Sequence, residues 1–110
     1  MIVRDYREVE SKPSDGVEGV SLRWVIAKDD GAPNFAMRVI DVQPGCATPH
    51  HEHAWEHEVF VLGGKGVVKG KDGERPLQEG SVVFVPGNEK HQFVNTGDGV
   101  LRFICLIPNC

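Results

Sequence analysis

The chain has 110 residues, a formal net charge of -4 and an isoelectric point near 5.7. At this length two hydrophobic cores would each be too small to be stable, so we expect one domain. An acidic chain has no basic stripe to neutralise phosphates, which excludes nucleic acid as a partner, and no apolar run is long enough to cross a membrane. Residues 1–10 lack the apolar stretch of a signal peptide, so we expect a cytoplasmic location.

The three cysteines, Cys46, Cys105 and Cys110, are sparse and odd in number, and no two of them form a CxxC pair. Such usage is typical of reduced thiols in a cytosolic protein rather than of a disulfide framework. A bridge between Cys46 and Cys105 stays open as the alternative. A thiolate zinc site would need cysteines that are more closely clustered.

Short β-branched and aromatic runs alternate with turn residues along the whole chain. The first sixteen residues are polar and predict an edge strand and a loop. The runs that predict strands are, in chain order, 17–27, 34–42, 57–62, 66–69, 81–85, 92–94 and 100–107. Asp-Gly pairs at 30–31, 72–73 and 98–99 predict hairpin turns, because Asp and Gly tolerate positive φ. We therefore expect an all-β sandwich or barrel, whose inward residues fill one end and wall a pocket at the other.

Four of the five histidines fall within residues 44–58. His51 and His53 are two residues apart, so an extended strand would project both rings from the same face. His57 is four residues further on and keeps this parity if the chain stays extended or turns at residues 54–56. The spacing therefore predicts three imidazoles on one side of the chain.

His91 lies 34 residues beyond His57 and would complete a ring of imidazoles if a neighbouring strand presents it to the same side. Neutral imidazole is a donor suited to divalent manganese, iron, cobalt, nickel, copper or zinc. The alternative for a lone His-x-His pair is a surface strand with exposed histidines. Glu56 and Glu58 are alternative oxygen ligands, acceptors that hold a histidine N–H, or solvated charges.

A second segment, residues 80–95, carries the other half of the pattern. Gly80 opens a predicted strand, Pro86 ends it, a tight turn follows, and His91 begins the return strand. Taken alone, the turn at residues 86–88 is typical of any β-turn. Its position relative to the histidine cluster makes it informative.

Together the two segments resemble the two cupin motifs. The first, G-x5-H-x-H-x3,4-E-x6-G, is matched by Gly45, His51, His53, Glu58 and either Gly64 or Gly66. The second, G-x5-P-x-G-x2-H-x3-N, is matched by Gly80, Pro86, His91 and Asn95, with Asn88 in place of the middle glycine. Asn is the mildest such change, because it tolerates the left-handed conformation.

The first motif departs from the common pattern, because His57 stands at the x3 position where many cupins have a metal-binding glutamate. Residues 55–62, together with 32–38 and 105–108, resemble the small single-domain four-histidine manganese cupins of thermophilic bacteria, and the likeness extends over residues 17–108. This resemblance implies that Glu58 is not a ligand. The metal ligands that it implies are His51, His53, His57 and His91.

The resemblance also implies a double-stranded β-helix, or jelly-roll, in which residues 1–110 form one cupin domain. Residues 1–16 would be the N-terminal edge strand and loop, and residues 17–108 the barrel. A homodimer is implied, with one divalent metal ion per chain: manganese first, and iron, nickel, cobalt, copper or zinc as alternatives. Phe103 and Cys105 match family positions whose side chains approach the metal pocket, although core packing would account for either.

Members of this group are associated with peroxide- or oxygen-dependent cleavage of alkene double bonds. The resemblance therefore implies an oxidoreductase that acts on a small organic substrate at a redox-active metal. Two other functions stay open, since fold and ligands do not determine a reaction. One is a metal-assisted isomerase or lyase, and the other is a non-catalytic module that binds a small ligand or a metal.

Overall fold

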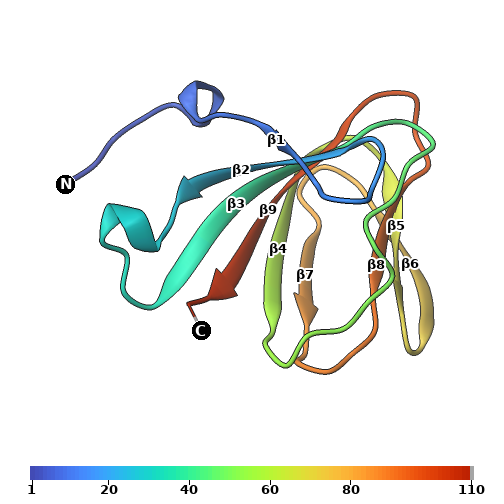
Figure 1. Cartoon of the computed structure of the whole chain (residues 1–110). Coiled ribbons are helices and arrows are strands. Elements are labelled where there is room, and N and C mark those ends of the chain that lie inside the picture. The colour runs from blue at the N-terminus through green and yellow to red at the C-terminus, as the bar shows by residue number, and fades with distance from the viewer. Residues whose placement is uncertain (110) are drawn as a thin grey trace.

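The computed structural model describes residues 1–109, which form two facing antiparallel sheets (Figure 1). The larger sheet has the order β1-β2-β3-β9-β4-β7 and the smaller one the order β6-β5-β8. The strands are β1 (Lys12–Pro13), β2 (Val20–Ile26), β3 (Phe35–Val42), β4 (His57–Gly63), β5 (Gly66–Gly70), β6 (Gly73–Leu77), β7 (Val82–Val85), β8 (Gln92–Asn95) and β9 (Leu101–Pro108). Two short 3-10 helices, Tyr6–Glu8 and Lys28–Asp30, complete the described elements. The predicted all-β jelly-roll is confirmed, and among residues 1–109 no helix is both long and apolar enough to cross a membrane.

The predicted strands correspond to β2, β3, β4, β5, β7, β8 and β9, but β6 was missed. The residues of β6 are mostly polar and include Pro76, which has no backbone N–H to give to a sheet. The structure explains why a proline is tolerated there. β6 is the outer strand of its sheet and pairs with β5 alone, so one side of its backbone has no neighbouring strand to bond.

Two of the three Asp-Gly pairs lie between strands that pair with each other, and the third lies between strands of different sheets. Residues 71–72 connect β5 to β6, and Gly73, the first residue of β6, has a φ of 109°. Residues 30–31 end the 3-10 helix between the paired strands β2 and β3. The hairpin prediction is wrong for residues 98–99, because β8 and β9 belong to different sheets and the segment crosses between them.

The core lies between the two sheets and is built from alternate strand residues. The largest fully buried side chains of the larger sheet are Val42, Val61, Leu101 and Phe103. The smaller sheet faces them with Val68, Leu77 and Phe93. The rings of Phe93 and Phe103 approach each other with centroids 4.8 Å apart, and both also line a cavity. That cavity therefore lies directly against the core.

An ion cluster on the larger sheet holds the N-terminal segment. Arg102 donates to both carboxylate oxygens of Asp41, at 2.7 and 3.1 Å, and to the hydroxyl of Tyr6 at 3.1 Å. Arg23 approaches the same carboxylate at 3.5 Å. This cluster anchors the 3-10 helix Tyr6–Glu8 to strands β2, β3 and β9.

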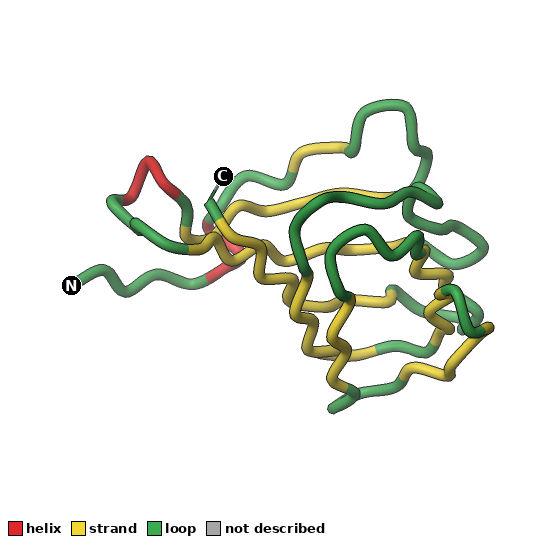
Figure 2. The backbone as a smooth tube through the Cα atoms, turned by 90° about the horizontal axis from the view of Figure 1, so that it is seen from below, coloured by secondary structure: helices red, strands yellow, loops and turns green. Residues whose placement is uncertain are grey.

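The part of the chain before β1 extends away from the barrel body, on the same side as the loop between β2 and β3 (Figures 1 and 2). Arg4 and Asp30 join these two segments through an ion pair of 3.0 Å. The edge strand predicted within residues 1–16 is limited to the short β1, which pairs with β2. The remainder of that region is loop and one 3-10 turn.

Asn95, the last residue of β8, joins three stretches of backbone. Its Nδ2 donates to the carbonyls of Val42 and Gly99, both at 2.8 Å, and its Oδ1 accepts from the N–H of Gly97 at 2.8 Å. The residue is buried, so no solvent replaces these bonds. Asn95 thus fixes the crossing between the sheets to the end of β3.

We expect the change Asn95→Ala to lower the free energy of unfolding by about 2–4 kcal/mol, because buried backbone groups lose their partners. Urea denaturation measures this loss. Thr96→Ala, at the exposed neighbouring side chain, serves as the control and should stay within about 0.5 kcal/mol. Equal stability of the two variants would contradict the anchoring role of Asn95.

Candidate functional site

Four histidines line one cavity from three parts of the chain. His57 is the first residue of β4, and His91 immediately precedes β8. His51 forms an isolated bridge with His91, in which each backbone N–H donates to the other carbonyl, at 3.2 and 3.0 Å. His53 lies in the connection to β4, so the extended strand expected for residues 51–53 is reduced to one bridge. All four side chains nevertheless line the same cavity, of about 360 Å³, which we call the histidine cavity.

The four imidazole rings are packed against one another. Centroid distances run from 4.3 Å between His51 and His53, through 4.8 Å between His57 and His91, to 6.3 Å between His53 and His91. The Nε2 atoms of His51 and His53 are 3.1 Å apart, within hydrogen-bond distance. The indole of Trp55 stacks on the ring of His53 at 4.5 Å and 7°, and so limits its orientation.

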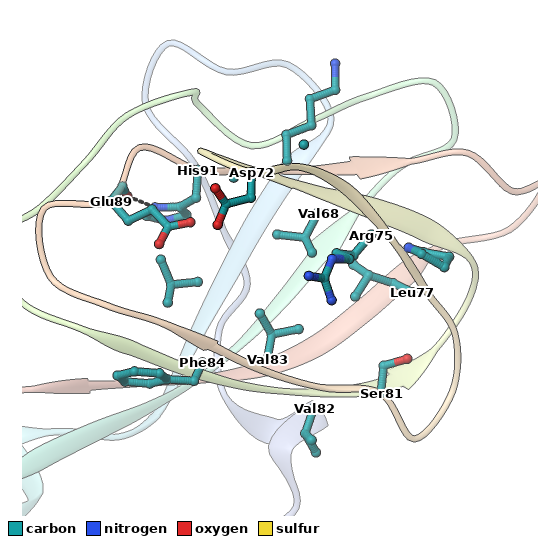
Figure 3. Close-up of a pocket in the computed structure, with 15 residues that line it drawn as sticks. Val68, Asp72, Arg75, Leu77, Ser81, Val82, Val83, Phe84, Glu89 and His91 are labelled. Atoms are coloured by element: carbon teal, nitrogen blue, oxygen red, sulfur yellow. Dashed lines mark hydrogen bonds between the residues drawn. The ribbon is translucent and has the colours of Figure 1, made fainter.

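Hydrogen bonds to Nδ1 orient two of the rings. His91 Nδ1 lies 2.9 Å from the carbonyl oxygen of Glu89, the contact drawn as a dashed line in Figure 3. Because a carbonyl only accepts, Nδ1 carries the proton and Nε2 keeps its lone pair. His57 Nδ1 faces Cys105 Sγ at 3.4 Å, whereas its Nε2 is buried without a hydrogen-bond partner.

Burial favours the neutral form of these rings. It is the largest cause of a pKa of about 4 for His57, and the positive charges of His91 and Arg38 lower that pKa further. Burial also lowers the pKa of His51 and of His53, again as the first cause. Neutral imidazole is the form that binds metal ions.

The nitrogen atoms of the cluster are close but not arranged as a complete coordination shell. Within residues 1–109, no three His, Cys, Asp or Glu side chains form a ready group of metal ligands. The contact between His51 Nε2 and His53 Nε2 directs these two nitrogens at each other, and a bound ion would have to replace it. The donor set itself fits an ion, because the buried Nε2 of His57 lacks a partner and three further imidazoles line the same cavity.

The rest of the wall of the histidine cavity is mainly apolar and contains no carboxylate. Its aliphatic and phenyl side chains are Val20, Leu22, Ile40, Phe93, Phe103 and Ile107. Arg38 is the one Lys or Arg side chain in the described wall. Phe103, predicted to approach the pocket, is fully buried and also belongs to the core. Phe103 therefore both packs in the core and lines the cavity, the two roles that the sequence left open.

Cys105, the other predicted pocket residue, is likewise buried and lines the cavity. Arg38 Nη2 donates to its Sγ at 3.0 Å, and burial is the main cause that raises the pKa of the Cys105 thiol. Cys46 and Cys105 are both free thiols, so the bridge that the sequence left open does not form. Cys110 lies outside the described residues.

The candidate carboxylate ligands lie on the opposite face. Along β4 the buried residues His57 and Val59 alternate with the exposed Glu58 and Phe60. Glu58 lines an apolar groove on the outer surface of the larger sheet instead of the histidine cavity. Glu56 is also exposed and borders that outer surface. Neither glutamate is therefore placed to join the four imidazoles.

A second cavity, of about 560 Å³, lies between the β5–β6 hairpin and β7 (Figure 3). The charged residues that line it are Lys69, Asp72, Arg75 and Glu89, and it shares only His91 with the histidine cavity. The Glu89 carboxylate accepts a hydrogen bond from the backbone N–H of Lys71 at 3.3 Å. The hairpin is thereby attached to the turn that carries His91.

Sequence reasoning missed several residues that build the histidine cavity. Thr48 Oγ1 accepts from the N–H of Phe93 at 2.9 Å, and Gln92 donates to the carbonyl of Thr48 at 2.9 Å. These partners are more than forty residues apart, so no local spacing reveals them. Arg38 and Trp55 lie in the segments that carry the family resemblance, which could have pointed to both.

The cupin domain family matches residues 38–107. The oxalate-binding protein of Thermotoga maritima is 34% identical over 65 residues, which cover 58% of this chain and 54% of that protein. Auxin-binding protein 1 of Arabidopsis thaliana is 34% identical over 117 residues, or 92% of this chain and 57% of that protein. The chain thus spans little more than half the length of these relatives. In three dimensions it is similar to the polyketide cyclase RemF from Streptomyces resistomycificus, with a TM-score of 0.91 and 29% identity over 98% of this chain and 79% of that one.

The change Thr48→Val keeps the side-chain shape but removes the acceptor for the N–H of Phe93. We expect the free energy of unfolding to fall by about 1–3 kcal/mol, and the Phe93 amide to exchange its hydrogen faster. Urea denaturation and hydrogen exchange measure the two effects. Thr48→Ser retains the hydroxyl and is the control; if it loses as much stability as the valine variant, the hydrogen bond is not the cause.

Proposed function

The chain belongs to the cupin family, whose domain matches residues 38–107, and we propose that its histidine cavity holds one divalent transition-metal ion. The proposed ligands are the four histidines of that cavity, His51, His53, His57 and His91. The observation that carries the proposal is the buried Nε2 of His57, which has no hydrogen-bond partner. A buried polar atom without a partner is costly, and an ion at this position would satisfy it.

The protonation of the rings supports the same proposal. The backbone carbonyl of Glu89 accepts a hydrogen bond from Nδ1 of His91, so the proton of the neutral ring stays on Nδ1 and Nε2 is available to an ion. The low pKa of His57 keeps its ring neutral at physiological pH. Binding of the ion would require His51 and His53 to exchange their mutual Nε2 contact for contacts with the ion. This is a change in two side chains, of which His51 is exposed and His53 half-buried.

Four neutral ligands would leave the ion with its full double charge. When bound, such an ion supplies a Lewis acid and, if it is redox-active, a centre for reaction with oxygen or peroxide. The usual affinity order places manganese below nickel, copper and zinc at a nitrogen site. Manganese is therefore proposed from the resemblance to four-histidine manganese cupins and from metal supply, and iron, cobalt, nickel, copper and zinc are the alternatives.

We further propose an oxidoreductase that uses oxygen or peroxide to oxidise a small organic substrate or to cleave its alkene bond. The apolar wall at Phe93, Phe103 and Ile107 would hold an apolar substrate body and exclude water from it. Cys105, whose pKa is raised by burial, would keep its proton and contribute an uncharged surface. The names of the similar proteins, a cyclase and two binding proteins, show that family membership alone does not select the reaction.

A second candidate is a non-catalytic binding module, which is favoured by the names of the two binding proteins among the relatives. It would hold a small ligand tightly without turnover. A metal-dependent isomerase or lyase would use the same cavity with the ion as a Lewis acid only, and would work with redox-silent zinc. The homodimer and the cytoplasmic location expected from the sequence stay predictions alongside these functions.

The change His57→Ala removes the buried nitrogen on which the metal proposal depends. We expect the affinity for manganese and zinc to fall by at least about tenfold, because even the outer hydrogen-bond partners of metal ligands commonly account for tenfold or more. Elemental analysis after dialysis and calorimetric titration measure the effect. His50→Ala, at the exposed fifth histidine outside the cavity, is the matched control and should bind normally. Unchanged stoichiometry and affinity in the His57 variant would refute the ligand set.

Comparing metals separates the proposed reaction from its alternatives. The manganese-loaded protein should consume oxygen or peroxide in the presence of an alkene substrate, and the zinc-loaded protein should not, because zinc has no accessible redox chemistry. An oxygen electrode and product analysis follow the reaction. Product formed with zinc and without consumption of oxygen or peroxide would instead support an isomerase or lyase, whereas tight ligand binding without turnover with any metal would support the binding module.

A further inference from the structure

The buried polar atoms that lack a hydrogen-bond partner within residues 1–109 all belong to side chains that line the histidine cavity. They are Arg38 Nε, Trp55 Nε1 and His57 Nε2. An ion would satisfy His57. The other two atoms carry hydrogen and cannot accept, so each of them lacks an acceptor.

Arg38 occupies an unusual electrostatic position. It lies on β3 opposite Trp24 of β2 and Cys105 of β9, and its guanidinium stands 5.4 Å from the centroid of the Trp24 ring. Its described hydrogen bond is made to the sulfur of Cys105, which is a weak acceptor. It lines the histidine cavity together with His53 and His57, which places it beside the cluster.

Arg38 also differs from most other arginines in having no carboxylate partner. Four of the six arginines form ion pairs with aspartates: Arg4, Arg7, Arg23 and Arg102. Among the described residues, Arg38 and Arg75 form none, and Arg75 is exposed to solvent. Arg38 is half-buried with an enclosed Nε, so water compensates for the missing partner less well.

The charges around the histidine cavity do not balance. No Asp or Glu lines it, whereas Arg38 in its wall is positive. A divalent ion would raise the positive charge further. Uncompensated charge in a partly buried, apolar site is unfavourable, so a ligand that brings a negative charge is favoured over a neutral one of the same shape.

We propose that Arg38 and Trp55 anchor the carboxylate of the substrate, so that the substrate is a small monocarboxylate with an apolar aryl or alkenyl body. The planar guanidinium presents parallel N–H donors that match a carboxylate, and the indole N–H adds another donor near His53. The apolar wall at Phe103 and Ile107 receives the body. The inference rests on the proposed function in locating the reacting carbon beside the ion, whereas recognition of the carboxylate needs only the chain.

The test compares cinnamate with cinnamamide, a neutral molecule of nearly the same shape, by isothermal titration calorimetry. Zinc-loaded and metal-free wild-type protein should both bind the carboxylate at least about tenfold more tightly than the amide. Arg38→Gln should reduce the affinity for cinnamate by about tenfold to a hundredfold and leave that for cinnamamide nearly unchanged. Trp55→Phe keeps an aromatic ring against His53 but removes the N–H, and should lower the affinity for cinnamate by a smaller factor.

Arg75→Gln, in the second cavity, is the matched control and should bind both compounds like the wild type. Equal affinity of the wild type for the two compounds, or no measurable binding of either, would overturn the proposal. An undiminished preference for the carboxylate in folded Arg38→Gln protein would also overturn it, because a group other than Arg38 would then recognise the negative charge of cinnamate. If Arg38→Gln fails to fold, the wild-type preference for cinnamate over cinnamamide and the affinity of Trp55→Phe for cinnamate still test the proposal. Metal content is measured in every sample: failure to retain metal counts against the proposed ion alone, while a carboxylate preference in the metal-free protein still supports the anchor.

Discussion

Two backbone hydrogen bonds between His51 and His91 join the segment before β4 to the start of β8, and the arrangement of the histidine cavity depends on them. They continue a short irregular ladder. The N–H of Thr48 donates to the carbonyl of Phe93 at 2.9 Å, and Asn95 donates to the carbonyl of Cys46 at 3.0 Å. The segment 46–51 therefore runs along the smaller sheet before the chain crosses to the larger one. The histidine cavity forms where it makes this crossing.

The larger sheet fixes the opposite side of the cavity. Arg38 on β3 is paired with Cys105 on β9, and Cys105 is paired with Val59 on β4, two residues after His57. Antiparallel register thus places the guanidinium, the thiol and an imidazole on the same inner face. His51 and His53, outside the regular strands, are the members that must turn for an ion to bind. The adjustment proposed for metal binding is consequently confined to the less regular half of the site.

Most of the fold could be predicted because its signals are local. Alternation of apolar residues and turn residues located the long strands, and Asn88 adopts the left-handed conformation expected of a glycine substitute, with a φ of 66°. The parity of His57 and Glu58 in β4 separated an inward ring from an outward carboxylate. The predictions that were wrong depended on contacts between distant parts of the chain. Residues 98–99 cross between the sheets instead of closing a hairpin. Strand β6 was not predicted because it contains Pro76, which is tolerated there because β6 lies at a sheet edge. The partners of Thr48 and Arg38 depend on strand pairing that one sequence does not reveal.

X-ray absorption spectroscopy of the zinc-loaded protein tests whether the metal is bound by imidazoles alone. We expect a first shell of nitrogen and oxygen near about 2.0–2.1 Å, with the multiple-scattering signature of four imidazoles. The variant His57→Ala should lose one of the four. A sulfur shell at about 2.3 Å would identify Cys105 as a ligand and contradict the proposed ligand set, as would a spectrum with two imidazoles or fewer.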